Sequence, residues 1–380
     1  MGAVQDRLAD AARVRERRGT VRTTRVGPGW EEDGGDRLLD LASNDYLGLS
    51  TDHRLKAAAI AATERYGTGA RASRVVTGTL PVHTELELAL AELTGQPAAL
   101  AFSSGYAANL GILTALGGPD TLILSDQHIH ASLVDAARLS RSPIETIPHS
   151  DLAVLGDVLA NRTQTRAIVV VESVYSVLGD APNLLDAAAL CAKYDALLVV
   201  DEAHGIGVLG EGRGGVHAAG LAGAEHVVVT ATLSKALGAQ GGAVLGSTML
   251  REHLVNTARS FIFDTGLAPA PAAAAAAGCR VILAEPERVE ALHRVASLIA
   301  SSCGVDRAAG PVQSIRVGSP ETAVEVTERL RDEGILVGCF RPPSVPDGIS
   351  RLRLTAHAGA DPDRLLWATA LITSMLLERP

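Results

Sequence analysis

The chain has 380 residues, of which 47% are hydrophobic and 20% charged, and its net charge is −9. This composition is typical of a globular protein and excludes a largely disordered chain, and the acidic balance argues against broad nucleic-acid binding. Four dispersed cysteines lack metal-ligand spacing and suggest no disulfide framework, and no apolar run of about 18 residues predicts a membrane span.

The first part of the chain is interpreted as an N-terminal arm and link over residues 1–43. Residues 1–25 are rich in arginine and predict an amphipathic helix, and residues 26–37 are a turn-rich link. Because the N-terminus lacks an apolar core, we expect no secretory signal and a cytoplasmic protein with reduced thiols. LLDLASNDYLGLS (38–50) predicts a short strand that runs into a loop.

Helix and strand patterns alternate from residue 44 to about 270. Helices are expected over 52–66 and 81–94. Seven short apolar runs follow, namely AALAFS, TLILSD, IETIPH, AIVVVES, ALLVVDEAH, HVVVTATLSK and GAVLGS. Strands so uniformly apolar are covered on both faces, so they predict a large α/β domain with a mostly parallel, seven-stranded sheet.

The pattern changes at about residue 271. An alanine-rich helix is followed by strands near SIRVG (314–318) and SRLRLTA (350–356) and by a closing helix. Residues 271–380 therefore predict a second, smaller α+β domain. Polar residues gather at the carboxyl ends of the earlier apolar runs, and open α/β sheets bind ligands at that edge.

The tetrapeptide DEAH (201–204) is also the label of a helicase class. A helicase or other P-loop ATPase needs GxxxxGK[ST], whose lysine reaches the phosphates of ATP. The chain has only three lysines, Lys56, Lys193 and Lys235, and none lies in such a loop, so the match is accidental. GEGRGG (210–215) fits GxGxxG, but it does not open a helix directly after a strand, so a loop is the better interpretation.

Another chemistry fits the same stretch. Asp201 ends one apolar strand and Lys235 follows the next, so both are expected at one edge of the sheet. A lysine with a lowered pKa can form a Schiff base with an aldehyde cofactor. A buried carboxylate can pair with a protonated ring nitrogen, which makes pyridoxal 5'-phosphate (PLP) an electron sink. Asp201, His204 and Lys235 together therefore predict a PLP site.

The phosphate of such a cofactor needs hydrogen-bond donors. FSSGYAAN (102–109) predicts a strand that leads into a helix, and free N–H groups at a helix N-terminus bind anions. A plain serine N-cap explains the same residues equally well. Thr232 can add a hydroxyl, His130 can stack on a flat ring and Ser176 can reach its phenolic oxygen. Each of these three is a weak signal alone, because structural hydroxyls and histidines are common.

Seven motifs resemble, in the same order, those of the α-oxoamine synthases. This family comprises fold-type I PLP-dependent transferases with the fold of aspartate aminotransferase. The motifs are SNDYLG (43–48), FSSGYAANLG (102–111), HASL (130–133), ESVYSVLGD (172–180), DEAHGIGVLGEGRG (201–214), TLSKALG (232–238) and RPPSVPDGISRLRLTA (341–356). The resemblance covers nearly the whole chain and implies a homodimer with active sites at the interface.

The resemblance also implies roles for residues of these motifs. Lys235 would carry PLP as a Schiff base and then remove the α-proton of the amino acid. Asp201 would pair with the ring nitrogen, His204 with the phenolic oxygen, and His130 with the face of the ring. Further cofactor contacts would come from Gly105, Tyr106, Ser176 and Thr232, and from Thr265 toward the cofactor of the partner subunit.

Substrate contacts are implied for a second set of residues. Arg353 would take the carboxylate of the amino acid as a charge-assisted pair, with Asn44 beside it. Arg22 and Ser344 would lie on the acyl side, and His130 would also touch substrate. No metal is implied.

Three segments point to one branch of the family, the one that serves biotin synthesis. They are AQGGAVLG (239–246), FIFDTGLAPA (261–270) and GCFRPPSVP (338–346). This branch implies decarboxylative condensation of L-alanine with a pimeloyl thioester, carried on CoA or on acyl carrier protein. The loop ARASR (70–74) and Ser344 depart from common family choices on the acyl side.

Other functions stay open at this point. Sister branches join glycine to acetyl-CoA or succinyl-CoA, or serine to a long-chain acyl-CoA, and they share the catalytic core. A non-catalytic regulator on the same fold is a further alternative, against which the intact set of Asp201, His204 and Lys235 argues.

Overall fold

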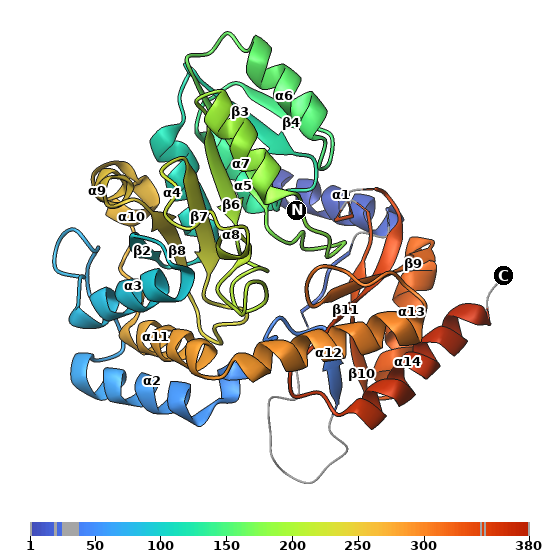
Figure 1. Ribbon diagram of the computed structural model, residues 1–380. Coiled ribbons are helices and arrows are strands. Elements are labelled where there is room, and N and C mark those ends of the chain that lie inside the picture. The colour runs from blue at the N-terminus through green and yellow to red at the C-terminus, as the bar shows by residue number, and fades with distance from the viewer. Residues whose placement is uncertain (1, 19–20, 25–37, 343, 346, 379–380) are drawn as a thin grey trace.

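The computed structural model describes residues 2–18, 21–24, 38–342, 344–345 and 347–378. The predicted link at 26–37 lies outside the described residues. Two sheets organise the described part of the chain, one of seven strands and one of four (Figure 1). No helix among the described residues is long and apolar enough to cross a bilayer.

The larger sheet has the strand order β2-β8-β7-β6-β5-β3-β4. Within it, β8 runs antiparallel to both of its neighbours, and the pairs from β7 to β4 are parallel. The strands are β2 Ala98–Phe102, β3 Thr121–Asp126, β4 Ile144–Ile147, β5 Arg166–Glu172, β6 Leu197–Asp201, β7 Val227–Thr232 and β8 Gly242–Gly246. Each comes from one of the predicted apolar runs, so the mostly parallel seven-stranded sheet is confirmed.

Helices cover both faces of this sheet, which is why its strands are apolar on both sides. On β5, Ile168 and Val170 pack into a core with α4 and α5, and Val169 and Val171 pack into the core on the opposite face. The helices of this part are α2 His53–Tyr66, α3 Pro81–Thr94, α4 Gly105–Leu116, α5 Ala131–Leu139, α6 Leu152–Asn161, α7 Leu184–Lys193, α8 Gly215–Ala218, α9 Thr248–Thr257, α10 Arg259–Ile262 and α11 Pro269–Ala284.

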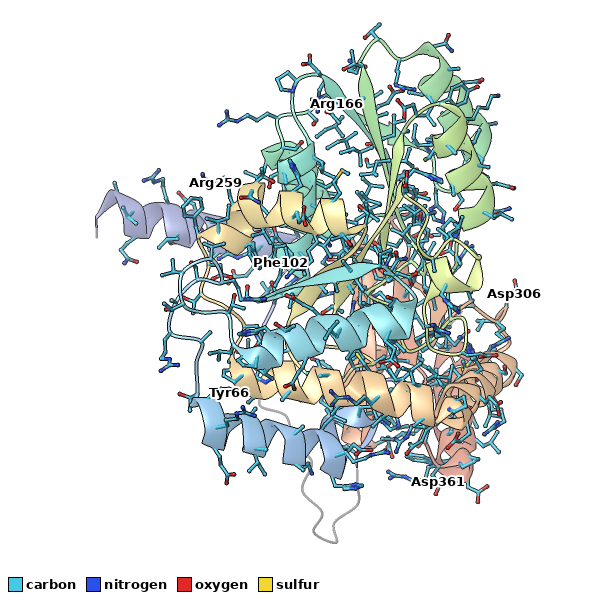
Figure 2. All side chains as sticks on the ribbon, turned by 60° about the vertical axis from the view of Figure 1, so that its left-hand side comes forward. Tyr66, Phe102, Arg166, Arg259, Asp306 and Asp361 are labelled. Atoms are coloured by element: carbon cyan, nitrogen blue, oxygen red, sulfur yellow. The ribbon has the colours of Figure 1, made fainter. Side chains whose placement is uncertain are left out.

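The local sequence explains where the predicted helices begin and end. α2 begins after Asp52, whose side chain accepts a hydrogen bond from the N–H of Arg54. α3 begins at Pro81 and ends before Gly95, which adopts the left-handed conformation. Figure 2 shows α2, α3 and α11 side by side below β2, whose last residue, Phe102, is labelled. The boundaries of α2 and α3 agree with the prediction to within one residue.

The smaller sheet joins the two ends of the chain. Its order is β1-β10-β11-β9, with β1 Leu39–Leu41, β9 Val312–Gly318, β10 Ile335–Phe340 and β11 Ser350–Thr355. β1 pairs in parallel with β10, with Leu39 opposite Ile335, and β11 is antiparallel to both β10 and β9. The helices α12 Pro286–Cys303, α13 Pro320–Asp332 and α14 Pro362–Leu377 complete this part. The sequence predicted β9 and β11 but not β10, and the domain boundaries at 43/44 and 270/271 stay a prediction.

The N-terminal helix is shorter than predicted. α1 spans Ala3–Arg17, and residues 21–24 are not helical, so the prediction of a helix through residue 25 is wrong there. None of its residues is buried, and Figure 2 shows it projecting from the body of the molecule. A helix with so little buried surface gains little from packing to extend it further. The short 3-10 helix Leu49–Thr51 follows β1 and leads into α2.

Candidate active site

A cavity of about 240 Å³ opens at the carboxyl ends of β5, β6 and β7. Asp201 is the last residue of β6 and Lys235 follows the end of β7 by three residues, so adjacent parallel strands bring them to one edge. The predicted site residues that line the cavity are Gly105, Tyr106, His130, Asp201, His204, Thr232 and Lys235.

Asp201 is buried and held in a fixed orientation. Its Oδ1 accepts a hydrogen bond from the N–H of Ala203 at 2.8 Å, and its Oδ2 accepts one from Nδ2 of Asn109 at 2.8 Å. Asn109 also donates to Oγ of Ser132 at 2.9 Å. A buried carboxylate is costly without a cationic partner, so its exposure to the cavity favours a cationic ligand there. Sequence reasoning missed Asn109, although it closes the FSSGYAAN motif.

A second acid, Glu172, lies beside Asp201 on β5. The two residues are register partners, and Glu172 is almost fully buried with no hydrogen-bond partner for Oε1 among the described residues. Burial and the negative charge of Asp201 raise the pKa of Glu172 well above its usual value. Burial and this repulsion disfavour the charged form of Glu172, and Asp201, which is fixed by two hydrogen bonds, is the better placed of the two acids to pair with a cation.

Lys235 has the properties of a nucleophilic amine. Burial lowers the pKa of Lys235 to about 8, and the attraction of Asp201 and Glu172 opposes this change. Its Nζ lies 3.0 Å from Nε2 of His204. A lysine with a pKa near 8 supplies a useful fraction of free amine at neutral pH, which an ordinary surface lysine does not.

His204 lies between Lys235 and a tyrosine that the sequence did not reveal as a site residue. Its Nδ1 is 2.6 Å from Oη of Tyr46, and Tyr46 donates to Oδ1 of Asn44 at 3.0 Å. Burial, together with the charges of Lys235 and Arg353, lowers the pKa of His204 well below its usual value, so the imidazole is neutral. Tyr46 stands in the motif SNDYLG, which was the available signal.

Asn44, Ser176 and Arg353 form a second group next to this chain of contacts. Arg353, in β11, donates through Nε to the carbonyl oxygen of Ser176 at 2.7 Å and through Nη2 to Oδ1 of Asn44 at 3.1 Å. Its guanidinium lies over the ring of Phe340, 5.4 Å from the centroid. A fixed, almost fully buried guanidinium is suited to bind a carboxylate. Ser176 joins this group through its backbone, and it is not one of the residues that line the cavity.

The N-terminus of α4 closes one end of the cavity. Ser104 caps the helix, since its side chain accepts a hydrogen bond from the N–H of Ala107. A Cβ atom at Gly105 would lie 3.0 Å from Cβ of Thr232, so this position allows a close approach of backbone that a side chain would obstruct. The hydroxyl of Thr232 lies 2.7 Å from that of Ser234. Helix N–H groups with two hydroxyls nearby are suited to hold a phosphate.

His130 caps α5 and faces the cavity from another side. Its Nδ1 lies 2.8 Å from Oγ of Ser132, which fixes the ring. Burial lowers the pKa of His130, so the ring that lines the cavity is neutral.

Arg22, Ser344 and Thr265 lie outside both the cavity lining and the group around Arg353. Arg22 donates to Oγ of Ser344 at 2.9 Å, and both side chains are exposed. This contact joins the N-terminal arm to the loop between β10 and β11. Thr265 is also exposed and pairs with Ser73 in an isolated bridge, so in one subunit it faces outward.

The residues present fit PLP. One cavity brings together the four kinds of group that PLP needs. They are a carboxylate for the ring nitrogen, two neutral imidazoles, a lysine with a lowered pKa and a helix N-terminus for the phosphate. No group of three or more potential metal ligands was found among the described residues. These groups suit an organic aldehyde that carries a phosphate.

Comparison with known proteins identifies the family. Residues 36–369 match the family described as Aminotransferase class I and II. The chain belongs to this family. It is 50% identical over 371 residues to a Mycolicibacterium smegmatis protein named 8-amino-7-oxononanoate synthase, covering 97% of this chain and 96% of that protein.

Two solved structures from the family extend the comparison. Serine palmitoyltransferase from S. paucimobilis, with a bound PLP–myriocin aldimine, has a TM-score of 0.85 at 29% identity, covering 89% of this chain and 87% of that chain. The 8-amino-7-oxononanoate synthase from Francisella tularensis has a TM-score of 0.78 at 27% identity, covering 90% and 98%. The predicted fold-type I architecture is thereby confirmed.

Proposed function

We propose that this chain catalyses the reaction of an 8-amino-7-oxononanoate synthase. It condenses L-alanine with a pimeloyl thioester, on CoA or acyl carrier protein, and releases CO2, the free thiol and 8-amino-7-oxononanoate for biotin synthesis. The observation that carries this proposal is the 50% identity, over 97% of the chain, to a protein of that name. The cavity supports it, because it holds every group that PLP chemistry needs.

PLP bound in the cavity supplies an electron sink that accepts the charge left when the amino acid loses a proton or CO2. Asp201 keeps the ring nitrogen positive, because a fixed, buried carboxylate favours the protonated form. Lys235 would hold the cofactor and, as a free amine, would take the α-proton of the substrate. Its lowered pKa keeps the amine available near neutral pH.

The remaining residues bind and orient. Arg353 takes the substrate carboxylate, assisted by Asn44, and holds the amino acid with its reacting carbon toward Lys235. His204 and Ser176 would hold the phenolic oxygen of PLP, and His130 would cover the face of its ring. Gly105, Tyr106 and Thr232 would hold its phosphate.

We propose that two copies of the chain form the working enzyme, in the cytoplasm. Thr265 is exposed, and an isolated bridge ties it to the loop that carries the exposed residues Val75 and Val76. Phe263, two residues before Thr265, is also exposed. Exposed apolar side chains clustered beside a proposed site residue favour a protein interface. In the dimer, Thr265 reaches the phosphate in the partner subunit, and Arg22 and Ser344 face the acyl substrate.

The decisive experiment is an assay of thiol release by the PLP-loaded protein with pimeloyl-CoA or pimeloyl acyl carrier protein. We expect turnover with L-alanine, a product with the mass of 8-amino-7-oxononanoate, and little turnover with glycine or L-serine. Lys235→Ala is the matched control and should lose both turnover and the absorption band of the cofactor–lysine bond. No release from either pimeloyl donor with L-alanine would contradict the proposal.

A serine-using enzyme is the second candidate. The TM-score to serine palmitoyltransferase, 0.85, is higher than that to the Francisella tularensis synthase, 0.78. Sequence identity favours the alanine enzyme, since the 50% match exceeds the 29% match by a wide margin. Release of thiol from a long-chain acyl-CoA with L-serine, and not with L-alanine, would establish this second candidate.

A further inference from the structure

Tyr46 is a buried polar residue that none of the roles above uses. Its side chain is fully buried, and its hydroxyl contacts two groups of the site, His204 and Asn44. Burial raises the pKa of Tyr46 to about 12, so the hydroxyl keeps its proton. It therefore has one proton to donate and lone pairs to accept with, and it sits between two possible partners.

The hydrogen bonds around Tyr46 have a direction that can be worked out. At neutral pH the Lys235 amine is mostly protonated, so it can only donate, and Nε2 of His204 accepts. Because His204 is neutral, its proton is then on Nδ1 and is donated to Tyr46. Tyr46 in turn donates to Oδ1 of Asn44, which also accepts from Arg353.

The direction of the hydrogen bond between His204 and Tyr46 can reverse while both side chains stay neutral. When the nitrogen of Lys235 is used in a covalent bond, it no longer donates to Nε2 of His204. His204 can then donate from Nε2 into the cavity only as the other tautomer, in which Nε2 carries the single proton and Nδ1 accepts a hydrogen bond from a neighbour. Tyr46 can be that neighbour, because rotation about its C–O bond turns the hydroxyl proton from Asn44 toward Nδ1 of His204.

We propose that Tyr46 is a positioning residue that sets which ring nitrogen of His204 carries the proton and that, through Asn44, links this choice to Arg353. When a substrate carboxylate draws Arg353 toward itself, Oδ1 of Asn44 becomes a freer acceptor for Tyr46. Binding of the amino acid therefore changes whether His204 donates or accepts at the cavity. This inference rests on the proposed function for the covalent use of Lys235 and for the carboxylate at Arg353.

The test is to locate the proton on His204 by long-range 1H–15N NMR of protein labelled on its histidine rings, with His204→Gln to assign the signals. In the cofactor-free protein at pH 7 we expect the proton on Nδ1. Loading with PLP should move it to Nε2 in the wild type and in Tyr194→Phe, which alters a tyrosine at the end of α7. In Tyr46→Phe the transfer should be incomplete, with both tautomers present.

A kinetic measurement separates positioning from a general loss of structure. Tyr46→Phe should lower kcat with L-alanine about tenfold, the effect of one buried hydrogen bond, and leave KM for the thioester unchanged. A proton on Nε2 in the cofactor-free wild type would overturn the proposal, and so would a complete transfer in Tyr46→Phe. The first result needs no variant, so it holds even if Tyr46→Phe does not fold. Failure to bind PLP would instead contradict the proposed function, and the proton on Nδ1 would still be observable.

Discussion

At the scale of single residues, the orientation of the Asp201 carboxylate is fixed by the hydrogen bonds that it accepts from the protein. One oxygen accepts from Ala203 and the other from Asn109, so its orientation does not depend on a ligand. Burial and the charge of Asp201 raise the pKa of Glu172 beside it. The two acids are register partners on neighbouring strands, and Asp201 is the one that two hydrogen bonds hold in place.

Asp201→Asn should leave PLP bound but inactive. A neutral amide cannot hold the ring nitrogen in its protonated form, and we expect kcat to fall by roughly 10²–10⁴-fold, the range seen when a positioned acid–base group is lost. The absorption band of the cofactor and the rate of thiol release should be measured on the same sample. Near-normal turnover would refute the role of this carboxylate.

Arg353→Lys should weaken the binding of the amino acid specifically. Lysine keeps the charge but loses the planar fork that contacts Ser176 and Asn44, and KM for L-alanine should rise about 10- to 100-fold for a loss of about 1.5–3 kcal/mol. KM for the thioester should not change. Arg316→Lys, on the neighbouring strand with an exposed side chain, is the matched control. An equal rise in both KM values would contradict carboxylate recognition by Arg353.

At the scale of elements, a cluster around His149 ties the ends of β3 and β4 to the loop after β5. Nδ1 of His149 lies 2.8 Å from Asp126, and Nε2 lies 2.6 Å from Asp180. The ring of His128 stacks on it at 3.7 Å between centroids, and Tyr175 meets it edge-on. Since this loop also supplies the carbonyl of Ser176 to Arg353, the cluster supports the group of residues that we propose binds the substrate carboxylate.

The cluster should make stability depend on pH. Burial alone would lower the pKa of His149, but Asp126 and Asp180 raise it to about 9, whereas burial keeps the neighbouring His128 neutral by lowering its pKa. A pKa raised above the unfolded value gives stability that is complete below about pH 6.5 and lost as pH rises through about 9. The contribution is about 1–3 kcal/mol after allowance for the partly exposed Asp180.

Urea unfolding of the wild type and of His149→Asn at pH 6, 7.5 and 9.5 would measure this contribution. We expect the free energies of unfolding to differ most at pH 6 and to converge at pH 9.5. A difference that is the same at all three values would show that the charge of His149 does not act as described.

At the scale of the whole molecule, the exposed apolar side chains predict a dimer that depends on two loops. Val76 is 72% exposed and Phe263 71%, on either side of the bridge between Ser73 and Thr265. Val76→Asp combined with Phe263→Asp should give a monomer in sedimentation velocity and lose most activity, because charged groups at an apolar interface are strongly unfavourable. Leu185→Asp, an exposed leucine on α7, is the control and should stay dimeric. A wild-type monomer with full activity would contradict the proposed assembly.

Local patterns predicted most of the fold and part of the site. Most of the seven strands were predictable because they are buried on both faces, the exposed edge strand β4 being the exception, and the shared edge of Asp201 and Lys235 followed from parallel strands. The place of Tyr46 beside His204 was not predictable, since 158 residues separate them and nothing local indicates the contact. β10 was missed because four of its six residues are only partly buried, and α1 was overextended because arginine favours helices in any surrounding.

The pairing of β1 with β10 imposes an order on folding during synthesis at the ribosome. Leu39 emerges early, but its partner Ile335 is made roughly 300 residues later, which takes about 15–60 s at common rates of synthesis. All strands of the large sheet have been synthesised by then, whereas β1 still lacks its partner strand. Asn44, which follows β1, accepts a hydrogen bond from Arg353, so a nascent chain that ends before β10 lacks both the partner of β1 and the guanidinium that we propose binds the amino acid.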